Sequence, residues 1–292
     1  MDTNTVRSHS KGEVGGHGMN EDGASEILSP FEVFGADVRE MRKARRITTT
    51  GLGSAIGYSA AYVSKVERGK MLPSARFAQG CDRAFGTGTV LYRQFIYALE
   101  GDHPSWFVPY LQHERQAQTL YIYSTLYLNG LFQTPDYARA LYRMSVPRLS
   151  AEQVEAKVLA RTARREILDR VDPPAPDIWV VLHEACLHVE AGGPTVMAGQ
   201  LQSLLEDAKR SNVSLQLLPF KAVPATSRPF TVLTFEREPT VLHAEGPQGG
   251  RPQDAPKITK AAMATYDLLR AEALGRDQTL SRIQTAYEEY LR

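Results

Sequence analysis

The segment from residue 48 to residue 70 constrains the fold of this chain more than any other. It holds two short runs whose apolar residues recur at helical spacing. Thr48 and Ser59 stand at positions where a helix N-cap is preferred. Gly57 lies between the runs, where the chain must turn and where a positive φ is cheap only for glycine. The pattern predicts two short helices joined by a tight turn.

The residues around this turn meet the packing needs of a helix-turn-helix. Gly53 supplies the small residue that lets the two helices approach, and the second helix needs apolar anchors on one side only. The expected anchors are Leu52, Ile56, Val63 and Val66. The opposite side of the second helix, over Ser59 to Glu67, is then free to enter the major groove of DNA.

These residues resemble the Cro/repressor-type helix-turn-helix, the xenobiotic-response-element family, over about residues 34–85. The most specific part is Val63-Ser-Lys-Val-Glu-Arg-Gly-Lys70 followed by Pro73-Ser74. It reproduces the family pattern Ile-Ser-x-Ile-Glu-x-Gly-x-x-x-Pro. The resemblance implies a domain that binds double-stranded operator DNA.

The resemblance also assigns roles to individual side chains. The positions that face base edges are Ala60, Ala61 and Lys65. Lys65 can donate to guanine O6 or N7, whereas the alanines offer only methyl contact, best suited to thymine. The expected phosphate contacts, which position the domain without reading sequence, are Thr49, Arg45, Arg46, Ser64, Arg68 and Lys70. Arg42 and Glu67 form the expected structural pair, and two roles stay open for Tyr62: contact with the DNA backbone or packing on the surface.

Charge is distributed unevenly along the chain. The net charge is only +1, but residues 34–86 hold ten Lys or Arg against four Asp or Glu, a net charge of about +6. A local basic patch on a nearly neutral protein is typical of a regulator with one DNA-binding face. Because two of the three reading positions are alanines, direct readout per half-site is modest, and specificity requires a homodimer or readout of DNA shape.

The rest of the chain divides by composition. Residues 1–29 have few large apolar residues, so we expect a disordered extension. Residues 30–100 are predicted to form the helix-turn-helix domain of five helices, and residues 101–109 a linker. Residues 110–292 predict a larger α+β domain of helices with an antiparallel sheet, long enough for its own core. The overall class is mainly α with an α+β C-terminal domain.

Several elements of the second domain are visible as patterns. Strands are expected over 178–187, 213–218, 230–235 and 240–245, and 120–127 is strand-like but ambiguous. Helices are expected from Thr134-Pro135 and over 150–170, 195–210, 258–274 and 280–291.

Several of these segments resemble the domain that follows the helix-turn-helix in WhiJ-like actinobacterial regulators, over about residues 110–291. They include Asn129-Gly-Leu-Phe-Gln-Thr-Pro-Asp-Tyr-Ala-Arg139, Arg161-Thr-Ala-Arg-Arg165, Leu182-His-Glu-Ala185, Gln200-Leu201, Leu218-Pro219 and Pro229-Phe-Thr231. Asn129 replaces a usual proline, and Arg165 a usual glutamine. The resemblance implies a regulator of development, secondary metabolism or a toxin–antitoxin-like pair, often acting beside a small partner protein.

Other chemistry has weaker support. His183 and His188 are five residues apart, which is not the four-residue step of a helical zinc site, so no metal is expected. Gly51–Gly57 has one residue too many for a nucleotide loop and follows no strand. Cys81 and Cys186 are expected to be reduced and packed as small apolar residues. No cofactor or catalytic group is expected. A low-ranking candidate ligand pocket consists of Tyr121, Tyr123, Tyr127, Phe132, Tyr137 and Tyr142, which more often form core.

The sequence therefore predicts a dimeric, repressor-like transcription regulator, not an enzyme, in the cytoplasm at the nucleoid. No apolar run approaches the ~18 residues of a membrane span. The C-terminal domain is expected to receive a small-molecule or protein signal. The alternative is an antitoxin-like docking protein with no small ligand. An enclosed apolar pocket favours the first, and an exposed apolar patch favours the second.

Overall fold

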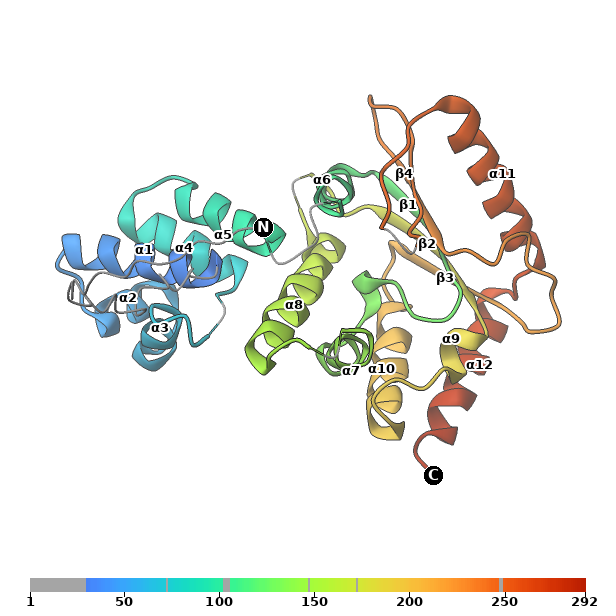
Figure 1. Cartoon of the computed structure of the whole chain (residues 1–292), viewed down its shortest axis with the longest axis horizontal. Helices are drawn as coiled ribbons and strands as arrows, with labels where there is room; N and C mark the ends of the chain where they lie inside the picture. The colour runs from blue at the N-terminus through green and yellow to red at the C-terminus, as the bar shows by residue number, and fades with distance from the viewer. Residues whose placement is uncertain (1–29, 72, 102–105, 147, 172, 247–248) are drawn as a thin grey trace, which may run out of the picture.

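The computed structural model describes residues 30–71, 73–101, 106–146, 148–171, 173–246 and 249–292. A helical N-terminal domain lies beside a larger α+β domain along the long axis of the molecule (Figure 1). This confirms the expected fold class. The disorder expected for residues 1–29 and the centre of the expected linker lie outside the described residues.

Five helices make the N-terminal domain: α1 (Pro30–Ala44), α2 (Thr49–Ile56), α3 (Ala60–Val66), α4 (Ala75–Phe85) and α5 (Val90–Gly101). Their ends follow local chemistry. The side chains of Thr48, Ser59 and Ser74 each accept a backbone N–H in the first turn of the next helix. Gly57 ends α2 with a φ of 78°, and Gly86 ends α4 with a φ of 68°.

The core of this domain follows the apolar pattern of the sequence. Phe34, Leu52, Val63 and Phe77 are completely buried in one cluster. Asp82 is a buried polar residue beside this cluster, at 2% exposure. Its carboxylate accepts the N–H groups of Leu91 and Tyr92 at 2.9 and 2.8 Å, and the hydroxyl of Thr87 at 2.6 Å, so it caps α5 from within α4.

The second domain alternates helices with five strands. Its elements are α6 (Val108–Gln116), β1 (Thr119–Ser124), η1 (Gly130–Phe132), α7 (Pro135–Ser145), α8 (Ala151–Ala163), η2 (Arg164–Asp169), β2 (Asp177–His183), α9 (Ala185–His188), α10 (Pro194–Asp207), β3 (Val213–Leu218), β4 (Phe230–Thr234), β5 (Val241–His243), α11 (Pro256–Glu272) and α12 (Arg276–Glu289).

The sheet is mixed, in the order β3-β2-β1-β4-β5. The expected antiparallel sheet is therefore only half right: β1, β2 and β3 run parallel, and β4 and β5 add antiparallel to the other edge of β1. The reason lies in the connections. The chain from β1 to β2 and from β2 to β3 passes through helices, and such crossovers return the chain in the same direction.

Helices cover both faces of this sheet (Figure 1). On one face, α11 packs through Tyr266 and Leu269 against a cluster that includes Tyr123 and Phe230. On the other face, Leu120 and Ile122 of β1 join the main core, to which α7, α10 and α12 contribute. Successive side chains of a strand point to opposite faces, which explains this division of β1.

Some expected boundaries were wrong. The helix expected over 150–170 changes to a 3-10 helix at Arg164, and the strand expected over 178–187 ends at His183, where α9 follows. Helix α6 occupies part of a region for which no element was expected. This helix is held by contacts with distant segments, since Tyr110 and Leu111 are buried in the main core. Its nine residues are too few to show a helical period in their apolar residues.

The two domains share a packing surface along α8. Ala160 of α8 is 2% exposed and belongs to the core cluster of the N-terminal domain, with Leu159 and Ala163 packed against it. The outer side of α8 therefore closes the core of the helical domain, although α8 lies in the second domain in sequence.

Both cysteines are free thiols and completely buried. Burial raises the pKa of Cys81 and of Cys186 to about 12. Because the folded pKa is raised, the native thiols keep protons that the unfolded chain loses. This contribution to stability is fully present below pH 9 and is lost as the pH rises from about 9 to about 12.

We therefore predict that neither thiol reacts with a disulfide reagent at pH 8 in the native protein, since a buried, protonated thiol is a poor nucleophile. Both should react at once in denaturant. A Ser281→Cys variant, which adds an exposed thiol on α12, is the positive control. Rapid reaction of either native cysteine in a spectrophotometric thiol assay would contradict the burial described here.

Candidate nucleic-acid interface

The turn between α2 and α3 is fixed by two glycines. A Cβ on Gly53 would lie 2.5 Å from the carbonyl oxygen of Tyr58, so only glycine allows the helices to approach this closely. Gly57 takes the left-handed conformation, and the N–H of Tyr58 bonds to the Gly53 carbonyl at 2.8 Å. The geometry is that of a helix-turn-helix with α3 as the second helix.

One side of α3 is anchored and the other is free. Val63 and Val66 are 0% and 1% exposed. Ala61 and Lys65 are exposed, while Ala60 and Ser64 are half-buried beside them. Of the three residues expected to face base edges, Ala61 and Lys65 therefore lie on the side of α3 away from its anchors, and Ala60 lies at the edge of that side.

A buried ion pair joins α3 to α1. The guanidinium of Arg42 donates to both carboxylate oxygens of Glu67, from Nε at 2.5 Å and from Nη2 at 2.8 Å. The two side chains are 12% and 4% exposed. The hydrogen bond to Glu67 raises the pKa of Arg42. A third donor of Arg42 reaches the carbonyl of Ile47 at 2.8 Å, so one side chain connects the end of α3 with the start of α2.

Tyr62 packs within the domain on the side next to α4. Its ring lies 4.6 Å from the ring of Tyr58 and 5.5 Å from that of Phe77. The hydroxyl of Tyr58 shares a hydrogen bond of 2.7 Å with Oγ of Ser74, which caps α4. Of the two roles open for Tyr62, packing is the one with contacts in the structure.

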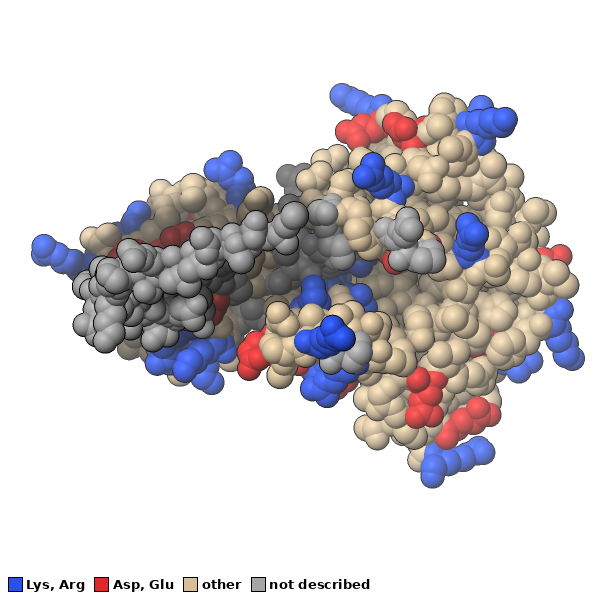
Figure 2. Space-filling model, in the orientation of Figure 1, with Lys and Arg blue, Asp and Glu red and all other residues tan. Residues whose placement is uncertain are grey.

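The other cationic candidates are exposed on the surface of the N-terminal domain. Arg46, Arg68 and Lys70 are exposed, and basic side chains gather along the lower edge of the helical domain in Figure 2, the edge where α3 lies in Figure 1. Nε of Arg68 donates to the carbonyl of Ser64 at 3.1 Å, which holds its side chain along α3. Thr49 is half-buried in the first turn of α2.

Arg45 is placed differently from the other phosphate candidates. Its guanidinium donates to the carbonyls of Phe85 and Met41, each at 3.1 Å, and lies 5.2 Å from the centre of the Phe85 ring. Two N–H donors of the Arg45 guanidinium are therefore already bonded within the domain. Arg76, for which no role was expected, is exposed in the first turn of α4 and reaches toward Gly57. Pro73-Ser74 marks the start of α4 in the sequence and could have indicated that Arg76 lies at a helix N-terminus.

Arg46 has an unusual backbone. Its φ is +55°, and it is the one residue other than glycine with a positive φ in the part of the chain that the structure describes. Such a conformation costs an arginine roughly 1–2 kcal/mol. A glycine would adopt this conformation at a lower cost in free energy. An arginine in a strained conformation therefore commonly marks a functional position.

The aromatic residues proposed as a ligand pocket do not come together. Phe132 and Tyr137 lie in the main core on one face of the sheet, and Tyr123 with Tyr121 lies on the other. Tyr142 lies under the guanidinium of Arg161, 4.1 Å from its carbon, and Tyr127 is 40% exposed. The candidate pocket was wrong because the sheet separates residues that are close in sequence.

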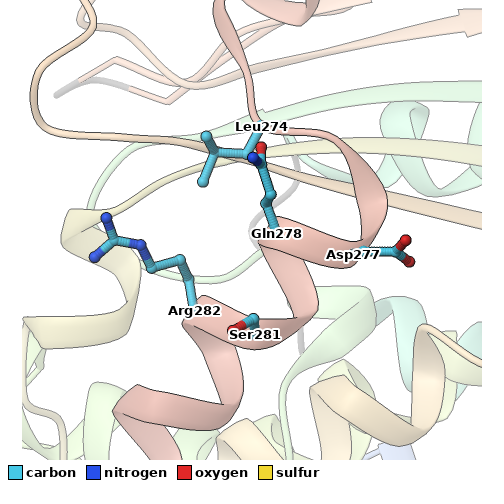
Figure 3. A pocket seen from close by; sticks show the side chains of 5 residues that line it. All are labelled: Leu274, Asp277, Gln278, Ser281 and Arg282. Carbon is cyan, nitrogen blue, oxygen red and sulfur yellow. The ribbon is translucent and has the colours of Figure 1, made fainter.

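The described part of the second domain includes two surface concavities that are open to solvent. One, of about 400 Å³, is lined by Leu274 and by Asp277, Gln278, Ser281 and Arg282 of α12 (Figure 3). The other, of about 580 Å³, lies between α7 and residues 191–196. Their linings are mostly polar or small, unlike the enclosed apolar pocket that would favour a small-molecule sensor.

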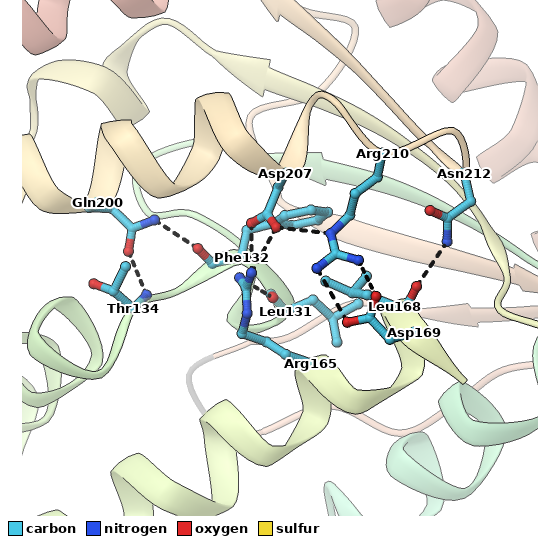
Figure 4. Close-up of polar contacts among 10 residues, drawn as sticks. All are labelled: Leu131, Phe132, Thr134, Arg165, Leu168, Asp169, Gln200, Asp207, Arg210 and Asn212. Atoms are coloured by element: carbon cyan, nitrogen blue, oxygen red, sulfur yellow. Dashed lines mark hydrogen bonds and ion pairs between the residues drawn. The ribbon is translucent and has the colours of Figure 1, made fainter. Parts of the chain in front are cut away.

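The motif around residues 129–134 is held by a polar network (Figure 4). The buried side chain of Gln200 donates to the carbonyl of Phe132 and accepts the N–H of Thr134, both at 2.7 Å. Arg165 donates to the carbonyl of Leu131 and, through Nη2, to both carboxylate oxygens of Asp207 at 2.7 and 2.9 Å. Three motifs that are distant in sequence therefore meet to shape one turn.

The neighbouring arginines of α8 and η2 continue this network. Arg164 forms a buried, two-pronged ion pair with Glu114 of α6 at 2.7 and 2.9 Å. Arg161 donates to Oε1 of Gln133 at 3.0 Å. A Cβ on Gly130 would lie 2.5 Å from Nη1 of Arg164, so this glycine leaves the space that the guanidinium occupies.

The two histidines considered for a metal site lie beside an aromatic ring in the second domain. His183 and His188 both contact the ring of Phe220, at 5.3 and 5.9 Å between centres. Across the residues that the structure places, no group of three or more His, Cys, Asp or Glu could hold a metal ion. Over the same residues, no helix combines the length and apolar character that a membrane crossing requires.

Comparison with known proteins gives two family matches. Residues 33–95 match a family model described as a helix-turn-helix domain, and residues 107–285 match one described as a domain of unknown function, DUF5753. No curated protein and no solved structure matches the chain. The first match covers α2, α3 and the residues that support them, so the helix-turn-helix is established by family as well as by geometry.

We predict that Gln200→Leu destabilises the protein by roughly 2–4 kcal/mol, because it leaves the buried Phe132 carbonyl and Thr134 N–H without partners. Gln202→Leu, at an exposed position of the same helix, should change stability by less than about 0.5 kcal/mol. Denaturant unfolding followed by circular dichroism measures both. Equal midpoints for the two variants would show that the Gln200 contacts contribute nothing net.

Proposed function

Because the chain belongs to the DUF5753 family and carries a helix-turn-helix domain ahead of that family's domain, we propose that it is a sequence-specific transcription regulator that binds operator DNA as a homodimer. The observation that carries this proposal is the free side of α3. Lys65 and Ala61 are exposed on a helix that Val63, Val66 and the Arg42–Glu67 pair hold rigidly. Motif resemblance supports assignment to the xenobiotic-response-element family.

In this proposal the side chains divide by role. Lys65 reads a guanine, and Ala60 and Ala61 contact thymine methyl groups. Arg46, Arg68, Lys70, Thr49 and Ser64 bind phosphates, with Arg45 held closer to its own domain. One base-specific hydrogen-bonding side chain per head gives little discrimination, so two heads must act together.

The second domain is proposed to receive the signal that regulates DNA binding. Support comes from α8, which closes the core of the DNA-binding head, carries Arg161 and leads directly into Arg164 and Arg165 of the second-domain network. A signal that favours one arrangement of this network would bias the head. The resemblance to WhiJ-like regulators supports a role in development or secondary metabolism.

The alternative proposal is an antitoxin-like protein whose second domain docks a small neighbouring protein without a small ligand. Two observations favour it. The two concavities described are open and mostly polar or small, and the second domain exposes large apolar side chains, among them Phe220 at 58% and Leu268 at 61%. Titration of the neighbouring protein into the DNA complex separates the two proposals.

We predict that Lys65→Ala relaxes sequence preference at one base pair per half-site, at a cost of about 1–3 kcal/mol for the preferred base. Arg68→Ala should instead weaken binding to all sequences and lower the salt dependence by about one unit of slope. Selection from a random DNA library, followed by binding titrations at several salt concentrations, measures both effects.

The matched control is Lys221→Ala, which removes an exposed lysine from the second domain. It should change neither preference nor slope. Were Lys65→Ala to weaken all sequences equally, Lys65 would be a phosphate contact. Wild-type protein that shows no preferred sequence would refute the regulator proposal.

A second prediction uses the backbone of Arg46. Arg46→Gly removes a strained positive φ, so stability should stay the same or rise by up to about 1 kcal/mol. The same change removes a phosphate contact, so DNA affinity should fall several-fold and the salt slope should decrease by about one. Arg46→Lys keeps the charge and the strain and is the control. A glycine variant with undiminished affinity would place Arg46 outside the interface.

A further inference from the structure

Helix α11 buries one side against the sheet and exposes the other. Tyr266 and Leu269 are at most 1% exposed in the cluster below it. On the outer side, Leu268 is 61% exposed and Ile258 40%. Three smaller residues are exposed as well: Ala261 and Ala264 between them, and Ala271 after Leu268. The outward side of a surface helix is normally polar, and among the residues that the structure describes none covers this face.

The spacing on this face is that of a helix-pairing seam. Ala261, Ala264, Leu268 and Ala271 follow one another by three, four and three residues, the alternation that keeps side chains against a neighbouring helix. Three of these four residues are alanines, which lets two helix axes approach closely. The helix has 17 residues and is therefore about 25 Å long, enough for the whole seam to be in contact.

The charges beside the seam are complementary to a reversed copy of the same helix. Lys260 and Asp267 are both exposed and lie seven residues apart, so they occupy the same flank. When two copies of α11 pair antiparallel about a twofold axis level with residue 263, Lys260 of each copy lies opposite Asp267 of the other. The symmetry produces this pair twice.

We propose that the outer face of α11 is the surface through which two copies of this chain dimerise, with the two helices antiparallel. Around the axis, Ala261 packs opposite Ala264 of the second copy, and Leu268 packs on the aliphatic part of Lys257. The self-complementary flank identifies the occupant as a second copy, because an unrelated protein would not require Lys260 and Asp267 at this spacing.

This inference deepens the proposed function, since it rests on the homodimer proposed there, but it does not depend on DNA binding. A single pair of helices is smaller than a standard interface of roughly 800 Å² per partner, so the dimer should dissociate on dilution. In Figure 1, α11 lies at the end of the molecule far from the DNA-binding head. The two heads of the dimer would therefore lie far apart and contact well-separated half-sites.

The test is charge reversal and its rescue in the full chain. Sedimentation equilibrium over a wide concentration range gives the dissociation constant of the dimer. Lys260→Glu and Asp267→Lys should each weaken the dimer about tenfold, and the double variant should return to within about threefold of wild type. Leu268→Glu should leave only monomer. Lys221→Glu, a reversal at an exposed site in the same domain, is the control and should have no effect.

A wild-type chain that stays monomeric at every concentration would overturn the proposal. So would a dimer that Leu268→Glu leaves intact, or a double variant no better than the single ones. Binding to a DNA fragment with one half-site is measured in parallel and should be the same for all variants. If the wild-type chain does not bind DNA, the regulator proposal is refuted. The sedimentation measurement would still decide whether α11 forms the dimer interface.

Discussion

The buried ion pair between Arg42 and Glu67 is the interaction on which the DNA-binding head depends. It joins residues 25 positions apart in sequence, and both side chains are nearly inaccessible to water. Such a pair adds little net stability against an apolar pair of the same shape, but loss of one partner leaves a buried charge. Its contribution is therefore geometric: α3 takes one orientation relative to α1. Gly35 supports it, because a Cβ there would meet the carbonyl oxygen of Val66 at 2.2 Å.

In the proposed complex with DNA, orientation matters because Lys65 is the one long side chain of α3 assigned to read a base by hydrogen bonding. A lysine is a flexible point donor, whereas the alanine methyl groups make contact only at van der Waals distance. Small rotations of the helix would lift Ala60 and Ala61 away from the groove while Lys65 still reached it. A rigid clamp on α3 thus has more effect on specificity here than it would in a head with several long polar reading residues.

The sequence predicted the head well because its signals are local. Caps at Thr48 and Ser59, the turn at Gly57 and the anchors of α3 all lie within 20 residues. The second domain depends on contacts between distant segments. Nothing near β1 in sequence indicates that it pairs parallel with β2, some 50 residues later. The aromatic set from Tyr121 to Tyr142 looked like one group, but the sheet divides it. The hydrogen bond from Arg45 to the carbonyl of Phe85 could not be predicted either, because it depends on where α4 ends.

The position of α8 bears on how a signal could reach DNA. Its outer side closes the core of the head through Ala160, and its last turn carries Arg161. Arg164 and Arg165 follow at the start of η2. Because interiors are closely packed, α8 cannot shift without opening a void in the head or breaking contacts of these arginines. Head and second domain are thus coupled through α8 within a subunit. In the proposed dimer the subunits meet through α11, far from the heads. Dissociation of this small contact would remove the second head from the DNA. Regulation would therefore act through the α11 contact more readily than through a change of angle between the head and the second domain of one subunit.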